Sequence, residues 1–85
     1  MKISDLITND KESIILAINL LGKESLNFFD EHNYDAAYAL VRLIQNFPER
    51  LYITDNRMHI KGSWVNISFD WFKTLIDEYE ISRNN

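Results

Sequence analysis

From residue 50 to residue 68, hydrophobic and polar residues alternate in three short runs, and two dipeptides with turn chemistry separate these runs. We take Asp55-Asn56 and Gly62-Ser63 as two-residue hairpin loops, with Gly62 at the first central position of a type II′ turn. Both hairpins then place the same apolar residues on one face: Leu51, Ile53, Met58, Ile60, Val65 and Ile67. A slip of one residue would mix the two faces, so the pattern predicts a three-stranded antiparallel meander.

The opposite face of this meander collects polar and aromatic residues: Tyr52, Thr54, Arg57, His59, Lys61, Trp64, Asn66 and Ser68. The alignment puts Tyr52, His59 and Asn66 in one row across the strands. A second row holds Arg50, Lys61 and Trp64. Because a sheet this small is not stable alone, we expect helices to cover its apolar face.

Three helices are predicted before the meander, over residues 9–21, 24–32 and 34–46. In the first, hydrophobic residues cover most of the circumference and only Glu12 and Asn19 mark a polar strip, which is typical of a buried core helix. Asn9 with Glu12 three residues later resembles a capping box. Gly22 suits the left-handed position at which a helix ends.

A last helix is predicted after Ser68, which can cap it. One face of this helix is apolar and the other is charged: Phe69, Phe72, Leu75, Ile76 and Tyr79 against Lys73, Asp77 and Glu80. Residues 82–85 are expected to form a frayed tail, and residues 1–8 fit either a strand or a helical turn. The 85 residues then make one domain, spanning 1–85, of the α+β class: three N-terminal helices, a three-stranded antiparallel β-meander and a C-terminal helix packed on the sheet.

Composition and charge narrow the function classes. Hydrophobic residues make up 46% of the chain and charged residues 26%, which is typical of a globular protein. The chain has no cysteine, which excludes disulfides, thiolate zinc sites and cysteine nucleophiles. No apolar run is long enough to span a bilayer and no signal-peptide pattern is present, so we expect a cytoplasmic protein. The net charge of −4 disfavours nucleic acid and favours a basic partner.

The sequence offers no catalytic constellation. Neither His32 nor His59 has a second ligand at metal spacing. The adjacent carboxylates Asp30-Glu31 do not face each other on a helix, nor do Asp77-Glu78, and neither pair makes an acid–base pair. We therefore predict a non-enzymatic protein with no cofactor and no metal.

Tyrosine, tryptophan and arginine dominate the binding energy of protein interfaces. We predict a partner-binding surface on the outward sheet face, formed by Trp64, Tyr52, His59, Arg50 and Lys61. Trp71 flanks it. Acidic groups are expected to steer a cationic partner, either Asp30, Glu31 and Asp35 or Asp77, Glu78 and Glu80. For Trp64, another reading is that the N-terminal segment covers it or that it stacks under Arg50 and Lys61.

The predicted function is a small acidic protein-binding domain, an inhibitor or immunity-type protein that occludes a nuclease or another nucleic-acid-processing enzyme. One alternative is a winged-helix-like DNA-binding or regulatory module, because three helices precede a locally basic β-ribbon. Another is a structural subunit of a larger assembly, a homo-oligomer that associates through the sheet face.

Overall fold

The computed structural model describes residues 2–84. Along the chain, the structure forms a 3₁₀ turn η1 (Ile3–Leu6), α1 (Lys11–Leu21), α2 (Glu24–Glu31), α3 (Asp35–Asn46), a second 3₁₀ turn η2 (Pro48–Arg50), β1 (Leu51–Thr54), β2 (Arg57–Ile60), β3 (Asn66–Ser68) and α4 (Phe69–Arg83). This order confirms the predicted α+β fold of three helices, a meander and a C-terminal helix.

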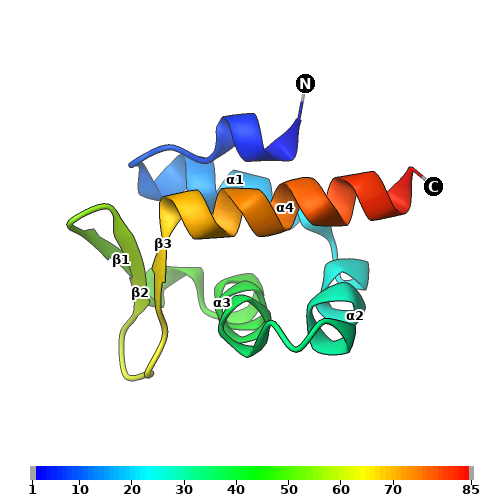
Figure 1. Cartoon of the computed structure of the whole chain (residues 1–85). Coiled ribbons are helices and arrows are strands. Elements are labelled where there is room, and N and C mark those ends of the chain that lie inside the picture. Colours follow the sequence, from blue (N-terminus) through cyan, green and yellow to red (C-terminus); the bar gives the residue numbers. More distant parts are fainter. Residues whose placement is uncertain (1, 85) are drawn as a thin grey trace.

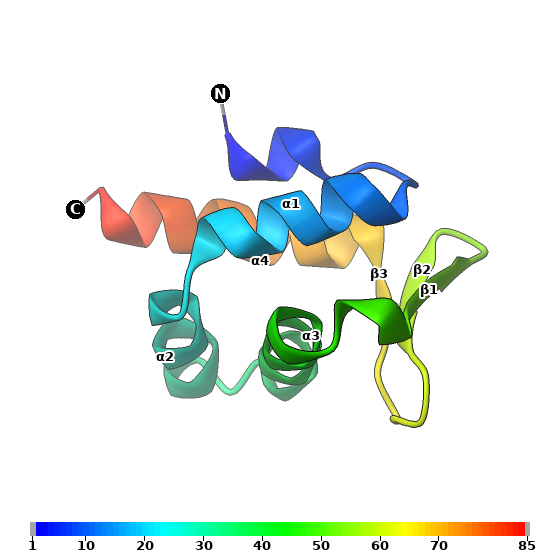
Figure 2. The ribbon, with the colours of Figure 1, turned by 180° about the vertical axis from the view of Figure 1, so that it is seen from behind.

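The helices form two levels, and the sheet stands at one end of them. Figure 1 shows α1 and α4 running across the upper part of the molecule, with α2 and α3 below them. Seen from behind, α2 again lies at the end far from the sheet (Figure 2). The sheet contacts α1, α3 and α4, and the contact with α4 is made through β3.

The three strands pair antiparallel in the order β1-β2-β3. The register of the first pair is the predicted one: Leu51 faces Ile60, Tyr52 faces His59, Ile53 faces Met58 and Thr54 faces Arg57. In the second pair Met58 faces Ile67 and His59 faces Asn66, again as predicted. Five of the six inward residues are buried and Ile53 is half-buried, so the faces are sorted as the alternation indicated.

The two hairpins close differently. Asp55 and Asn56 have positive φ angles of 51° and 58°, as the two central residues of a type I′ turn require. The second hairpin does not close in a two-residue loop, so this prediction was wrong. The strand β3 begins only at Asn66, the Ser63 N–H donates to the Ile60 carbonyl (3.1 Å), and Gly62 with φ +79° is the third residue of that turn. A wider loop over residues 61–65 results.

The helix α1 differs from the prediction in its cap and in its burial. Its cap is Asp10, whose carboxylate accepts from the Ser13 N–H, and not Asn9. Four residues of one face are buried: Ile14, Ala17, Ile18 and Leu21. The opposite face is open, because Leu16 and Leu20 are each about half exposed (52% and 51%). The helix is therefore a one-sided core helix that η1, α3 and the sheet cover.

The helix α4 joins the first residues of the chain to the core. Ser68 caps it as predicted, accepting from the Trp71 N–H, and its five predicted apolar residues are buried. On the charged face, Asp77 accepts from the Ser4 hydroxyl (2.6 Å) and Glu80 from the Ile3 N–H (2.9 Å). The open question of residues 1–8 is thus answered by a 3₁₀ turn docked on α4, with Met1 outside the described residues.

The predicted fraying of residues 82–85 is wrong for the residues that the structure describes. The helix α4 continues to Arg83, whose guanidinium lies 5.5 Å from the centre of the Tyr79 ring. The Asn84 N–H donates to the carbonyls of Glu80 and Ile81, which caps this last turn. Asn85 falls outside the described residues.

Candidate functional site

Two aromatic rings stack at the centre of the outward sheet face. Tyr52 and His59 face each other across β1 and β2, with their ring centres 4.8 Å apart and their planes at 11°. The Thr54 hydroxyl lies 2.7 Å from Nε2 of His59 and fixes the imidazole from its other side. Tyr52 is 47% exposed. The pair is therefore a rigid aromatic surface rather than two mobile side chains.

Arg57 is held across the strands beside this pair. Its guanidinium donates to the Asn66 side-chain oxygen and, at 3.2 Å, to the Asn66 carbonyl. This second bond uses a backbone carbonyl on β3, which is an edge strand. The arginine thus protects an edge that would otherwise be available for strand pairing.

Trp64 projects from the loop over residues 61–65 and is 69% exposed. The N-terminal segment does not cover it, because η1 packs against α1 and α4. Arg50 does not stack on it either, since its guanidinium lies 4.5 Å from the centre of the Phe47 ring. The alternative readings in which the N-terminal segment or Arg50 masks the indole are therefore wrong. Val65 beside it is buried, so the predicted inside–outside alternation holds through the loop.

Arg50 and Lys61 lie together at the end of the β1–β2 ladder, where the Lys61 N–H donates to the Arg50 carbonyl (2.9 Å). Both side chains are exposed. They line an open hollow of roughly 620 Å³ together with Glu49 and Gly62. We call Arg50, Lys61, Gly62 and Trp64 the Trp64 surface.

Trp71 belongs to a different group of residues. Its ring meets the Tyr34 ring edge-on, with the centres 6.3 Å apart. The Tyr34 hydroxyl donates to the Glu78 carboxylate (2.9 Å), and this hydrogen bond, helped by slight burial and by the negative charge of Glu78, raises the pKa of Tyr34. We call Tyr34, Trp71 and Glu78 the Trp71 cluster.

Three of the predicted steering carboxylates flank the α2–α3 connection that carries Tyr34. Asp30 and Glu31 lie at the end of α2, Asp35 begins α3, and all three are exposed. In Figure 1 this connection lies on the far side of α3 from the sheet. The structure thus separates the predicted site residues into a cationic set on the sheet and an acidic set around α2 and α3.

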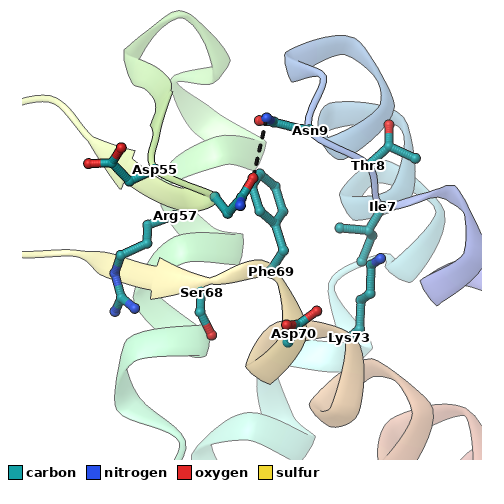
Figure 3. A pocket seen from close by; sticks show the side chains of 10 residues that line it. Ile7, Thr8, Asn9, Asp55, Arg57, Ser68, Phe69, Asp70 and Lys73 are labelled. Carbon is teal, nitrogen blue, oxygen red and sulfur yellow. Dashed lines mark hydrogen bonds between the residues drawn. The ribbon is translucent and has the colours of Figure 1, made fainter.

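A second hollow, of roughly 350 Å³, lies where the β1–β2 turn meets residues 7–9, ahead of α1, and the first turn of α4 (Figure 3). Phe69 and Ile7 give it apolar walls, and Asp70 and Lys73 reach it from α4. The Asn9 amide donates to the Asn56 side-chain oxygen (3.4 Å) across its rim. None of the predicted partner-binding residues lines it, because its walls come from three separate stretches of chain, 7–9, 55–57 and 68–73, that no short motif connects.

The remaining histidine, His32, is exposed at the C-terminal end of α2. Its Nδ1 lies 2.8 Å from the Phe28 carbonyl, and its ring centre lies 4.1 Å from that of Phe28. Within residues 2–84, no three histidine, aspartate or glutamate side chains come together as a metal site would require. In the same stretch, no helix combines the length and the apolar character needed to cross a bilayer.

No family model, curated protein or solved structure matches this chain. The function of the chain is therefore inferred from the chemistry of its own surfaces. Among the surfaces described above, the outward sheet face with the Trp64 surface combines exposed aromatics with cations, of which Arg50 is held against the Phe47 ring.

Proposed function

We propose that this chain is a non-enzymatic protein-binding domain that contacts its partner through the outward sheet face, with Trp64 as anchor. The observation that carries the proposal is the exposed indole: 69% of Trp64 lies open on a loop whose neighbouring residue, Val65, is fixed in the core. An indole left in water is a large apolar surface, and interface hot spots are enriched in tryptophan, tyrosine and arginine.

The neighbouring residues support an interface because they are already ordered. The Tyr52–His59 stack and the Arg50–Phe47 contact hold four side chains in place before any partner arrives. Side chains that are fixed in advance lose less conformational entropy on binding, so more of the contact energy appears as affinity.

The non-enzymatic character of the chain remains part of the proposal. Histidine is the side chain that most readily moves protons at neutral pH. Here His59 is occupied by Thr54 and Tyr52, and His32 by the Phe28 carbonyl and ring. These contacts give both histidines a structural role, and no catalytic role is needed to account for either residue.

The narrower proposal is an inhibitor or immunity-type protein whose partner is a nucleic-acid-processing enzyme. It is supported by the net charge of −4 and by the exposed carboxylates Asp30, Glu31 and Asp35. An enzyme with a basic nucleic-acid groove would be attracted to these groups over several ångströms. Because these carboxylates lie away from Trp64, the enzyme would meet them with a different part of its surface.

Differential capture tests the proposal. The full chain, Trp64→Ala and the matched control Ile81→Ala, which removes another exposed apolar side chain (64% exposed), serve as baits for an extract of the source cell. We expect a partner that the full chain and the Ile81 variant retain and that Trp64→Ala binds about thirtyfold more weakly, equivalent to ~2 kcal/mol. Equal retention by all three baits would contradict the role of Trp64.

The winged-helix-like alternative is favoured by one observation, the exposure of Arg50, Arg57 and Lys61 on one small sheet. If it is correct, the chain should shift duplex DNA at low salt and lose that shift steeply as salt rises. The absence of a shift at low salt would eliminate it.

A further inference from the structure

We infer that the Trp64 surface takes an acidic segment of a partner protein, docking a carboxylate between Arg50 and Lys61 and an apolar side chain on the indole. This inference rests on the proposed function, because it names the chemistry of the partner at the same surface.

The two cations, Arg50 and Lys61, lie next to each other across the strands. The hydrogen bond between the Lys61 N–H and the Arg50 carbonyl fixes their backbones as direct neighbours. Both side chains are exposed and line the same open hollow. A carboxylate that enters this hollow is within reach of two positive groups at once.

The Arg50 side chain is oriented by an aromatic ring. Its guanidinium lies 4.5 Å from the centre of the Phe47 ring. A guanidinium that stacks on a ring keeps its N–H groups free at the edges, where they can form a bidentate pair with a carboxylate. The stacking therefore orients the Arg50 guanidinium for a planar anion and leaves its N–H groups available as donors.

The hollow beside the two cations is accessible from outside the protein. Gly62 lines the hollow, and a Cβ built on it would meet no atom within 4 Å. The loop is therefore open at Gly62, and Trp64 lies two residues further along the same loop. A short extended segment can lie across Gly62 and reach both the hollow and the indole.

The charge of the hollow favours a protein over a nucleic acid. Glu49 lines it beside Arg50 and Lys61, which leaves one net positive charge. One carboxylate balances that charge, whereas a run of phosphates would meet Glu49 and the net charge of −4 of the whole chain. The same count disfavours a strongly acidic patch and favours a mixed acidic and apolar segment.

A titration with a synthetic peptide tests this inference. The probe is a short peptide with one glutamate next to a phenylalanine among neutral residues, and its control is the same peptide with glutamine in place of the glutamate. Fluorescence is read in the Trp71→Phe variant, where Trp64 is the only tryptophan. We expect a saturable change with the glutamate peptide, weakened about tenfold in Lys61→Glu and unchanged in Lys23→Glu, a matched exposed lysine on the α1–α2 connection.

Three results would overturn the inference. The glutamine peptide could bind as tightly as the glutamate peptide, which would remove the role of charge. A single-stranded oligothymidylate could bind more tightly than either, which would make this a nucleic-acid surface. Sedimentation without peptide could show self-association that Lys61→Glu abolishes, which would make the occupant a second copy. Failure of the proposed function is distinguishable, because differential capture asks whether a partner needs Trp64, whatever the charge of its segment.

Discussion

The two ends of the small sheet differ in how they are fixed to the helices. At the turn end, formed by Asp55 and Asn56, the Asn56 carbonyl accepts from the Phe69 N–H of α4 (3.3 Å), and the Asn56 side chain accepts from Asn9 ahead of α1. At the loop end, formed by residues 61–65, Val65 is the buried residue and Trp64 projects outward. The turn end is hydrogen-bonded both to α4 and to the segment ahead of α1. The loop end is held by the buried Val65 side chain and by the hydrogen bond of its own turn.

This difference separates structural from functional roles on one sheet. The turn end uses its polar side chains to join three elements, so changes there should cost stability. The loop end keeps the side chains of Trp64, Arg50 and Lys61 free of such bonds, so changes to these side chains should cost binding, whereas the backbone turn at Gly62 contributes to stability. The following predictions test this division, ordered by their expected effect on the free energy of unfolding.

The largest effect is expected in the core that both ends share. Ile18→Asp places a carboxylate at a fully buried position of α1, and an unpaired buried charge costs several kcal/mol. That is comparable with the whole stability expected for this length, about 4–13 kcal/mol. We expect an unfolded chain by circular dichroism. Leu16→Asp, on the exposed face of the same helix, should fold, and equal loss in both variants would show that the two faces of α1 are assigned wrongly.

At the loop end, Gly62→Val should destabilise by about 1–3 kcal/mol, because a β-branched residue resists a positive φ. The cost is conformational and not a clash, since the space around a Cβ is open. Gly62→Asn is the matched control, because asparagine adopts positive φ more readily and should lose less. Urea unfolding compares the three chains, and equal stability of the valine variant and the parent would contradict the observed turn.

At the turn end, Ser68→Ala should cost about 1 kcal/mol, because it removes the hydroxyl that accepts from the Trp71 N–H and caps α4. The control is Ser82→Ala, an exposed serine inside the last turn of the same helix, which should change stability by less than about 0.5 kcal/mol. Thermal melting measures both. An equal loss of stability in the two variants would contradict the stabilising role of the Ser68 cap.

Tyr79 lies away from both ends and should show a small effect that depends on pH. Burial, and secondarily the negative charge of Glu24, raises the pKa of Tyr79 against the lowering influence of Arg83. The folded chain therefore holds the phenol proton when the unfolded chain has released it, and stability falls as pH rises from about 10. Tyr79→Phe should flatten this alkaline fall. An unchanged fall in melting temperature between neutral and alkaline pH would show that Tyr79 does not contribute to it.

The sequence alone predicted the strand register and the inward residues, because a period of two leaves one arrangement that buries all apolar residues together. It failed at Gly62, because glycine supplies positive φ equally to a two-residue turn and to the wider loop. The predicted burial of Leu16 and Leu20 was wrong, because a helical wheel shows that a residue is apolar but does not show whether another element covers it.

The candidate site was predictable only in part, for a related reason. Register placed Tyr52, His59 and Trp64 outward, and the structure agrees. The position of Trp71 depends on how α4 crosses the α2–α3 connection, and no local pattern contains that angle. The contact between the Trp71 and Tyr34 rings is therefore seen only in the structure.

The most direct test of the central claim is the melting temperature of Trp64→Ala, measured beside its affinity for the partner that the full chain captures. Because the indole is 69% exposed and Val65 provides the inward contact, we expect stability to change by less than about 0.5 kcal/mol while binding weakens about thirtyfold. A large fall in melting temperature with normal binding per folded molecule would make Trp64 a structural residue and contradict the account.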